Sequence, residues 1–192
     1  MKNIRPHLVE CAAETARVAR GVTAAQLSTP STCARWEVRH LVNHLVLYTS
    51  HGLEHRALRK QLPEELTARD FTAEPDWAER YAAQLDRALA AWSDPAVWEG
   101  DIDLGFTTMP ASGIASLLVK ELAVHGWDLA RSTGQDFRIT DPAAGLVLDV
   151  VREHAEIYRR YDGFAAPVPV PDSAGLFDRA LAATGRDPHG RP

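Results

Sequence analysis

The sequence has 192 residues, a net charge of −5 and 45% hydrophobic residues, which is typical of one domain with a substantial core. Its 21 lysine and arginine residues are scattered, so neither nucleic acid nor a membrane surface is expected as a partner. No apolar run approaches a membrane span, and the start of the chain lacks the apolar segment of a signal peptide. Two cysteines, Cys11 and Cys33, make no disulfide framework in a chain of this size. We therefore expect a cytoplasmic protein, either a monomer or a homodimer.

Two helices are predicted in the first third of the chain. Apolar residues at helical spacing indicate a helix over about 6–27, which the turn-forming residues 28–32 end. A second helix is expected over about 34–61, and Pro63 prevents it from continuing. A polar connection follows over 64–74. The apolar arc of the second helix consists of Val38, Leu41, Val42, Leu45 and Val46.

A third helix and a short extended segment come next. Pro75 suits the first turn of this helix, whose apolar stripe begins at Trp77 and ends at Trp92. From 97 to 108 the hydrophobic period changes to two, which predicts a strand or short hairpin that connects helices. The alternating apolar residues of this segment are Ile102, Leu104 and Phe106.

The second half of the chain predicts a long helix, a fifth helix and a tail. The long helix begins near Ala111 and ends at Gly134, which is placed to close it in the left-handed conformation. The start signal Thr140-Asp-Pro142 opens a fifth helix that runs to about Tyr161, and a proline-rich extended segment follows. Ser173 is expected to cap a last short helix that contains Leu176, Phe177 and Leu181, with Gly185 after it.

These elements indicate an all-α fold, in which four main helices form a bundle with a short β excursion and a C-terminal strap. The bundle domain is expected to span 1–162. The strap, 163–192, is expected to pack on the same domain with its short helix.

One stripe of the long helix combines apolar residues with groups that bind metals. Ile114 and Leu118 begin the stripe, and Glu121, His125 and Asp128 continue it. Burying such polar groups is costly unless each has a partner, and one metal ion satisfies several of them. Glu121 and His125 are one helical turn apart, so both can reach the same ion. The stripe therefore predicts a metal site.

A third ligand should come from a facing helix, and the second predicted helix offers histidines. His40, His44, His51 and His55 fall within about 60° of one another on its surface, beside the apolar arc. His44 has the best position, because it lies in the middle of the helix among apolar neighbours. The other three are predicted to be ordinary boundary residues, since histidine is a residue of intermediate burial.

Simpler interpretations of the same residues remain open. Glu121 and His125 form a surface pair if the helix is rotated, although the leucines around them argue against it. Asp128 lies one turn beyond His125, and it either joins the metal ligands or accepts a hydrogen bond from a ligand imidazole. The tryptophans at 77, 92 and 127 are predicted to be core residues rather than a stacking platform.

Two segments of the chain together resemble a known family. The first is Thr29-Pro30 with Cys33-Ala-Arg-Trp-Glu-Val-Arg-His-Leu-Val-Asn-His-Leu45, and the second is Glu121-Leu-Ala-Val-His-Gly-Trp-Asp-Leu-Ala-Arg-Ser-Thr-Gly134. They are similar to the metal-binding domain of mycothiol-dependent maleylpyruvate isomerase. They are more closely similar to the stand-alone actinobacterial metal-binding proteins of the DinB-like four-helix superfamily, as is the tail from Pro167 to Pro188.

The resemblance implies an up-down-down-up bundle with a divalent ion at its mouth, held by His44, Glu121 and His125. Many superfamily members carry a histidine where Glu121 stands here, and the glutamate matches the isomerase pattern instead. Two imidazoles and one carboxylate suit Zn²⁺, with Ni²⁺, Fe²⁺ and Mn²⁺ as alternatives. The isomerase has a further C-terminal domain that helps to form its active site. This chain is expected to be too short to contain that domain, and the strap, 163–192, is expected to cover the metal mouth instead.

The leading functional hypothesis is a metal-dependent isomerase or S-transferase that uses a low-molecular-weight thiol, with mycothiol as the first candidate. The ion would lower the pKa of the thiol, and the thiolate would add to an electrophilic small-molecule substrate. Asp128 is the candidate catalytic residue, which either orients a ligand imidazole or accepts a proton. Neither Cys11 nor Cys33 has a sequence context that suggests a nucleophile.

Two other classes of function are weighed against this one. A metal-binding sensor or small-molecule binding module needs the same ligands but has no thiol-dependent chemistry. A helical bundle without a metal is the third class, and it predicts that Glu121→Leu or His125→Leu stabilises the fold. Fold alone does not decide function, so an experiment has to separate these classes. Only the first class predicts a thiol-to-cobalt charge-transfer band in the cobalt-substituted protein.

Overall fold

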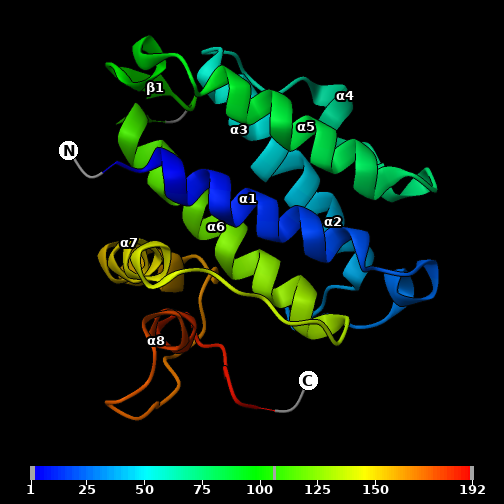
Figure 1. The fold of residues 1–192 in the computed structure, drawn as a ribbon, viewed down its shortest axis with the longest axis vertical. Coiled ribbons are helices and arrows are strands. Elements are labelled where there is room, and N and C mark those ends of the chain that lie inside the picture. Colours follow the sequence, from blue (N-terminus) through cyan, green and yellow to red (C-terminus); the bar gives the residue numbers. More distant parts are fainter. Residues whose placement is uncertain (1–2, 106, 191–192) are drawn as a thin grey trace. The chain divides into compact units, whose positions relative to one another are not determined.

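The structure, a computed structural model, describes residues 3–105 and 107–190 (Figure 1). The chain forms two compact units, Met1–Phe137 and Arg138–Pro192, and each is described by itself. Compact units need not coincide with folding domains, so the domain boundary expected after residue 162 stays a prediction. None of the described helices is long and apolar enough to cross a membrane.

The first unit is an up-down-down-up bundle of helices, which confirms the predicted all-α, DinB-like fold. Its helices are α1 (Arg5–Arg20), α2 (Val38–Leu45), α3 (Gly52–Ala57), α5 (Trp77–Ala91) and α6 (Ala111–Ser132). Helix α1 packs against α5 and α6, while α2 packs against α6 and α3 against α5 (Figure 1). Because α2 and α3 are two parts of one continuous helix, they count as a single segment of the bundle.

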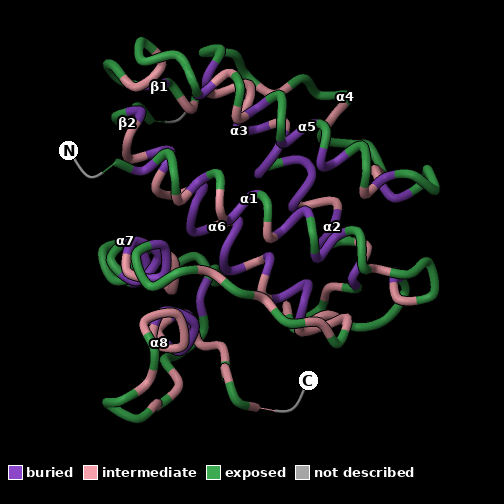
Figure 2. The backbone as a smooth tube through the Cα atoms, in the orientation of Figure 1, coloured by how far each residue is buried: buried purple, intermediate pink, exposed green. Residues whose placement is uncertain are grey.

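Helix α6 lies at the centre of this core, and buried residues occupy most of its length (Figure 2). It approaches α1 closely at Gly126, where a Cβ atom would lie 2.7 Å from the hydroxyl oxygen of Thr15 and 2.5 Å from the ring of Phe137. The Thr15 hydroxyl lies 3.1 Å from the carbonyl oxygen of Leu122 on α6. The absence of a side chain at residue 126 is therefore what lets these two helices meet.

A π-turn, η2 (Val46–His51), joins α2 to α3. Within it, Thr49 and Ser50 each donate a side-chain hydrogen bond to the carbonyl oxygen four residues earlier, both at 2.6 Å. A π-turn adds one residue to a helical turn, so it rotates the helix beyond it by about 100° relative to an unbroken α-helix. The sequence predicts that His40, His44, His51 and His55 share one side of the helix. The rotation interrupts this alignment, because His51 no longer lies on the stripe of His44.

Several helices end earlier than the sequence predicts. Helix α1 stops at Arg20 and a 3-10 helix, η1 (Ala24–Ser28), follows, whereas the sequence predicts one helix to about residue 27. The Gln135 side chain lies against Gly21 and donates to the carbonyl oxygen of Val18 at 3.0 Å. This hydrogen bond satisfies one of the carbonyl groups that a helix end leaves without a partner.

The second predicted helix, 34–61, spans Val38–Ala57 in the structure. Arg35 (φ 71°) and Arg59 (φ 54°) lie just outside its two ends in the left-handed conformation, which does not continue a right-handed helix. In the third predicted helix, Pro75 precedes the first residue of α5 rather than lying in its first turn.

The connections between the helices contain several short elements. Strands β1 (Asp101–Asp103) and β2 (Thr108–Pro110) pair antiparallel, with Ile102 opposite Met109, which confirms the predicted short hairpin. Phe106, the third apolar position of that prediction, lies outside the described residues. The hairpin is shorter than predicted, because Val97 belongs to a 3-10 helix. The remaining short helices are η4 (Pro95–Trp98), α4 (Glu64–Thr67) and η3 (Phe71–Ala73).

The second unit consists of α7 (Asp141–Arg160), α8 (Leu176–Ala183) and the segments around them. The two helices pack against each other. The extended segment that precedes α8 is joined to the end of α8 by backbone hydrogen bonds, such as Ala165 N–H to Thr184 C=O at 3.1 Å. Gly185 closes α8 with φ 89°, and a Cβ atom there would collide with Ala165. The residue that caps α8 is Gly175, not the predicted Ser173.

A polar network around Asp70 fixes the connection between α4 and α5 and provides a prediction. Hydrogen bonds from Thr72, Asn43 and Arg39 hold the pKa of the Asp70 carboxyl at about 2, against the opposing effect of its partial burial. A lowered folded-state pKa means that the ionised group stabilises the fold above about pH 4, and that this contribution disappears as the pH falls toward 2.

We therefore expect Asp70→Asn to lower the free energy of unfolding by about 1 kcal/mol at pH 7, a figure reduced for the exposure of this side chain. The difference from wild type should vanish near pH 2. Urea unfolding across this pH range measures the effect, with the exposed Asp86→Asn on α5 as the matched control. A deficit that stays constant with pH would contradict the assignment.

Candidate metal centre

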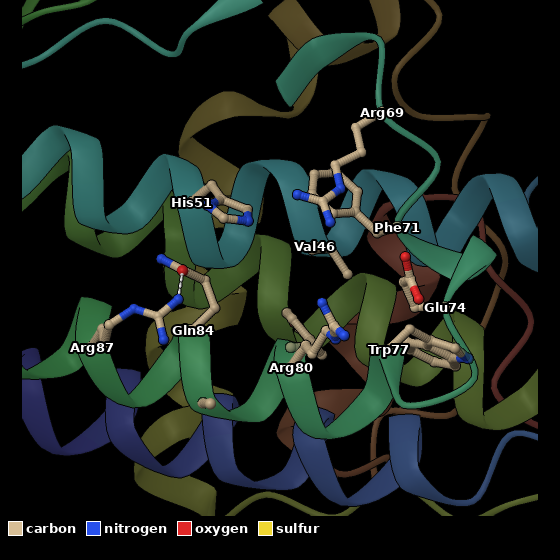
Figure 3. Close-up of a pocket in the computed structure, with 11 residues that line it drawn as sticks. Val46, His51, Arg69, Phe71, Glu74, Trp77, Arg80, Gln84 and Arg87 are labelled. Atoms are coloured by element: carbon tan, nitrogen blue, oxygen red, sulfur yellow. Dashed lines mark hydrogen bonds between the residues drawn. The ribbon is translucent and has the colours of Figure 1, made fainter. Parts of the chain in front are cut away.

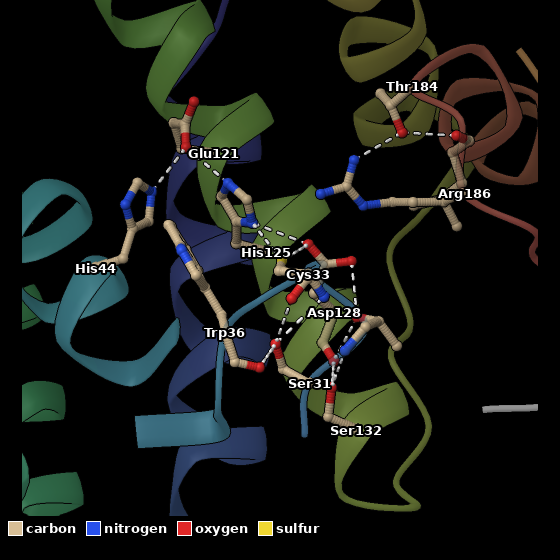
Figure 4. Close-up of polar contacts among 12 residues, drawn as sticks. Ser31, Cys33, Trp36, His44, Glu121, His125, Asp128, Ser132, Thr184 and Arg186 are labelled. Atoms are coloured by element: carbon tan, nitrogen blue, oxygen red, sulfur yellow. Dashed lines mark hydrogen bonds and ion pairs between the residues drawn. The ribbon is translucent and has the colours of Figure 1, made fainter. Parts of the chain in front are cut away.

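Three side chains from two helices of the first unit bring their donor atoms together (Figure 4). Glu121 and His125 lie one turn apart on α6, and His44 comes from the end of α2. The Glu121 Oε2 atom is 3.4 Å from His44 Nε2 and 3.3 Å from His125 Nε2. The structure thus places together the three residues that the sequence selected as ligands; that they bind a metal stays a prediction.

The geometry of this group fits a small divalent ion. Tetrahedral zinc holds nitrogen and oxygen ligands at about 2.0–2.1 Å, which separates neighbouring ligand atoms by roughly 3.3 Å. The two distances from the glutamate oxygen to the imidazole nitrogens match this separation. Since the three donor atoms all lie within 4.8 Å of one another, only small adjustments of the side chains are needed to coordinate one ion.

The electrostatic environment keeps Glu121 ionised. Burial by itself raises the pKa of this carboxyl, but the ammonium group of Lys120, together with His44 and His125, holds that pKa well below its usual value. Lys120 is only 2% exposed, and its Nζ atom forms an ion pair with Glu121 Oε1. The other oxygen, Oε2, is the one that faces the imidazoles, so the carboxylate is both charged and aimed at the centre.

Asp128 orients the imidazole of His125. Its Oδ2 atom lies 2.8 Å from His125 Nδ1, and the Asp128 side chain is fully buried. Thr32 donates a hydrogen bond to the other carboxylate oxygen at 3.1 Å. A proton on Nδ1, shared with this carboxylate, leaves the lone pair of Nε2 directed at Glu121 and His44, as in many carboxylate–histidine–metal arrangements. The geometry favours the orienting role for Asp128 over direct ligation of the same ion.

Cys33 is a neighbour of the site that the sequence did not single out. Its Sγ atom lies 3.2 Å from Asp128 Oδ2 and 3.8 Å from His125 Nδ1. It therefore approaches the ring nitrogen opposite to the one that faces Glu121. Only the motif around Cys33 hinted at this position, because more than ninety residues separate it from His125 along the chain.

Aromatic and basic side chains surround the three donor atoms. The ring of His44 lies between those of Trp36 and Tyr48, with centroid distances of 5.2 and 4.9 Å. Arg56 extends back along the helix, so that its Nη1 atom is 3.5 Å from the Tyr48 carbonyl oxygen. Burial lowers the pKa of Arg56, and the negative charge of Glu121 opposes that shift. The centre thus has apolar walls with a guanidinium group nearby.

The other histidines of the second helix do not join this centre. His40 is exposed. His51 stacks on Phe71, with ring centroids 5.3 Å apart, and His55 Nδ1 lies 2.8 Å from the His51 carbonyl oxygen. The prediction that only His44 among them points to the site agrees with this placement. Of the predicted core tryptophans, Trp77 and Trp92 are buried and Trp127 is half-buried.

The orienting role of Asp128 gives a second prediction. Asp128→Asn keeps the shape of the side chain but removes the charge that holds the proton on His125 Nδ1, so the affinity for zinc should fall by about 10- to 100-fold. Competition with a chromophoric chelator measures this affinity, with Asp86→Asn as the control. Unchanged affinity in a variant that melts like the wild type would rule out the role.

Comparison with known families decides the relationship of this chain. Residues 8–130 match the family described as the mycothiol maleylpyruvate isomerase N-terminal domain. The chain belongs to this family. The match confirms the resemblance carried by the two sequence segments. A search of curated proteins found no match.

Two solved structures share the fold of this family member. They are the mycothiol-dependent maleylpyruvate isomerase and a mutant of it with one histidine replaced by alanine. The TM-scores are 0.66 and 0.68, with 17% sequence identity in both cases, and each comparison covers 98% of this chain and 90% of the isomerase chain. The coverage corrects one expectation: the chain is not too short to match the C-terminal part of the isomerase. That the strap covers the metal mouth stays a prediction.

Proposed function

We propose that this protein binds one divalent ion, Zn²⁺ first among the candidates, through His44, Glu121 and His125. We further propose that it uses a low-molecular-weight thiol, mycothiol, to isomerise a small electrophile or to transfer the whole thiol to it as an S-conjugate. The observation that carries this proposal is the convergence of the three donor atoms in a member of the mycothiol maleylpyruvate isomerase family. Catalytic zinc sites with two histidines and one glutamate keep a fourth position for water or substrate, and the same donor set is present here.

An ion in this position would supply the Lewis-acid chemistry that lowers the pKa of a thiol and makes it a nucleophile at neutral pH. The protein's own residues prepare the site for it. Asp128 fixes the orientation of His125, and Lys120 keeps the Glu121 carboxylate ionised. Trp36 and Tyr48 provide aromatic surfaces beside His44, and Arg56 offers a positive charge that attracts a substrate carboxylate.

The proposed isomerisation requires no oxidant or reductant. The thiolate forms an S–C bond with one carbon of a conjugated C=C bond, and the electron pair moves onto the neighbouring carbonyl oxygen. Rotation about the resulting single bond is followed by return of the electron pair and cleavage of the S–C bond. The thiol is regenerated and the double bond has the opposite geometry. In the S-transfer alternative, the adduct takes up a proton and is released.

Cobalt substitution tests the proposal. We expect mycothiol to produce a thiolate-to-cobalt charge-transfer band in the near ultraviolet, and maleylpyruvate to be isomerised only when both the metal and the thiol are present. His125→Ala is the control without a complete ligand set, and glycerol, which lacks the thiol, controls for mixing effects.

The outcomes separate the two metal-binding hypotheses. A band together with turnover supports the enzyme. A bound metal that gives no band with any candidate thiol contradicts thiol activation, and it favours the sensor or small-molecule binding module. A band without turnover of maleylpyruvate keeps the thiol site but contradicts that compound as the substrate.

A further inference from the structure

A second pocket of about 290 Å³ lies in the first unit between η2, the η3 connection and α5 (Figure 3). Val46 and His51 line it from η2, and Trp77 and Tyr81 line it from α5. None of the three candidate metal ligands contributes to its walls. The π-turn explains the separation, because it turns His51 toward this pocket while His44 faces α6. The pocket is thus distinct from the candidate metal centre.

The charges around this pocket are mainly positive. Arg69, Arg80 and Arg87 line it, with Glu74 as the one acidic residue among its lining side chains. Arg80 is paired with Asp76 at 2.8 Å. Arg69 and Arg87 have no ion pair with any carboxylate among the described residues, and Arg87 donates instead to the neutral side chain of Gln84. Two guanidinium groups therefore remain available for an anion.

The pKa of His51 also reflects the positive charge around the pocket. Burial lowers the pKa of His51, and the positive charges of His55, Arg87 and Arg69 lower it as well, whereas Glu54 opposes the shift. Glu54 accepts a hydrogen bond from Gln84 at 2.5 Å. Among the described residues, it forms no ion pair with the arginines of the pocket.

Planar side-chain groups form much of the wall. The imidazole of His51 stacks on Phe71 with an angle of 25° between the rings, and the guanidinium carbon of Arg69 lies 5.5 Å from the centre of the same ring. Trp77, Tyr81 and Val46 are buried and supply the apolar floor. Planar rings and guanidinium groups in one pocket favour a ligand that has a planar apolar body and a negative charge.

The connection that carries Arg69 and Phe71 is held in place before any ligand arrives. The Asn43 side chain of α2 accepts a hydrogen bond from Phe71 N–H at 2.8 Å and donates one to Asp70 at 3.0 Å. Asp70 in turn accepts from Arg39 at 3.0 Å. A preorganised wall reduces the entropy lost on binding, which favours recognition of a small ligand.

We propose that this pocket is a second ligand site, which binds a small aromatic or planar carboxylate independently of the metal centre. The carboxylate would pair with Arg69 or Arg87, which lie on different sides of the pocket (Figure 3), and the planar body would lie between Phe71 and the floor of the pocket. A volume of 290 Å³ is at the lower end of small-molecule sites, which suits a ligand of the size of benzoate. The proposal does not depend on the function proposed for the metal centre.

Isothermal titration with benzoate tests this site, with benzamide as the neutral analogue and inorganic phosphate as an anion without an apolar body. We expect saturable binding of one benzoate per chain, with benzamide and phosphate both weaker by at least about tenfold. At least one of Arg69→Ala and Arg87→Ala should weaken benzoate binding by about five- to tenfold, since both guanidinium groups are exposed. Arg160→Ala, an exposed arginine on α7, is the matched control and should change nothing.

A further variant separates this pocket from the metal centre. His125→Ala should bind benzoate as the wild type does, because no metal ligand lines the pocket. Loss of benzoate binding in His125→Ala would place the anion on the metal and overturn the proposal. Equal affinity for benzoate and benzamide, equal affinity for benzoate and phosphate, or no effect of either arginine variant would also overturn it.

Discussion

His44→Ala and His125→Ala are each expected to abolish metal binding, from about one ion per chain in the wild type to less than about a tenth of that. Each substitution removes one of the two imidazoles of the proposed ligand set and leaves two protein donors, fewer than the three that catalytic zinc sites have. Metal analysis by mass spectrometry on tag-free protein, after equilibration with zinc and removal of unbound ions, measures the stoichiometry.

His40→Ala is the matched control, because His40 lies one turn before His44 on the same helix and is exposed. It should retain the full metal content. Because bound metal stabilises the folded state, the two ligand variants should also lose the rise in melting temperature that zinc gives the wild type. A wild-type protein that takes up no zinc, nickel, iron or manganese would contradict the site altogether.

Trp92→Ala is expected to lower the free energy of unfolding by about 3–5 kcal/mol, the largest effect on stability that we predict. The side chain is 0% exposed and lies at the end of α5. Its indole N–H donates to the carbonyl oxygen of Leu53 on α3 at 2.8 Å, and its ring meets the edge of Trp98 at 4.9 Å. Truncation would leave a cavity and a buried carbonyl group without this donor.

Urea unfolding of the metal-free protein measures this effect without a contribution from bound ions. Leu58→Ala is the control, since Leu58 is 49% exposed at the end of α3, the helix that Trp92 contacts, and its truncation should cost about 0.5 kcal/mol or less. If both substitutions lower the free energy of unfolding by a similar amount, Trp92 does not have the special role in core packing that we assign to it.

Some residues of the candidate metal centre could be identified from the sequence, and one neighbour of the centre could not. The relation between Glu121, His125 and Asp128 is local, because the pitch of one helix places them on one stripe wherever that helix packs. His44 could be selected as well, because it lies in the middle of the predicted helix, beside the apolar arc and among apolar neighbours. Cys33 could not, since a cysteine in a turn has no periodicity that reveals its neighbours. Its approach to His125 depends on how the loop before α2 packs against α6.

The second pocket was beyond the reach of sequence reasoning for a similar reason. Arg69, Phe71 and Arg87 come from a connection and a helix that are polar and unremarkable in sequence. Their convergence depends on the hydrogen bonds of Asp70 and Asn43 and on the π-turn that redirects His51. A π-turn has no compositional signature comparable to a proline or a glycine, so the sequence predicts that the four histidines share one side of the helix.

The sequence by itself determined the all-α class, the approximate helices, the hairpin and the face of α6 that carries the candidate ligands. These features follow from the periodicity of apolar residues and from local helix geometry, which short segments encode. Only the tertiary structure decided the exact helix ends, the distance between His44 and Glu121, the place of Cys33 and the arginine-lined pocket. These depend on contacts between residues far apart in the chain, where packing and hydrogen bonds with distant partners override local preference.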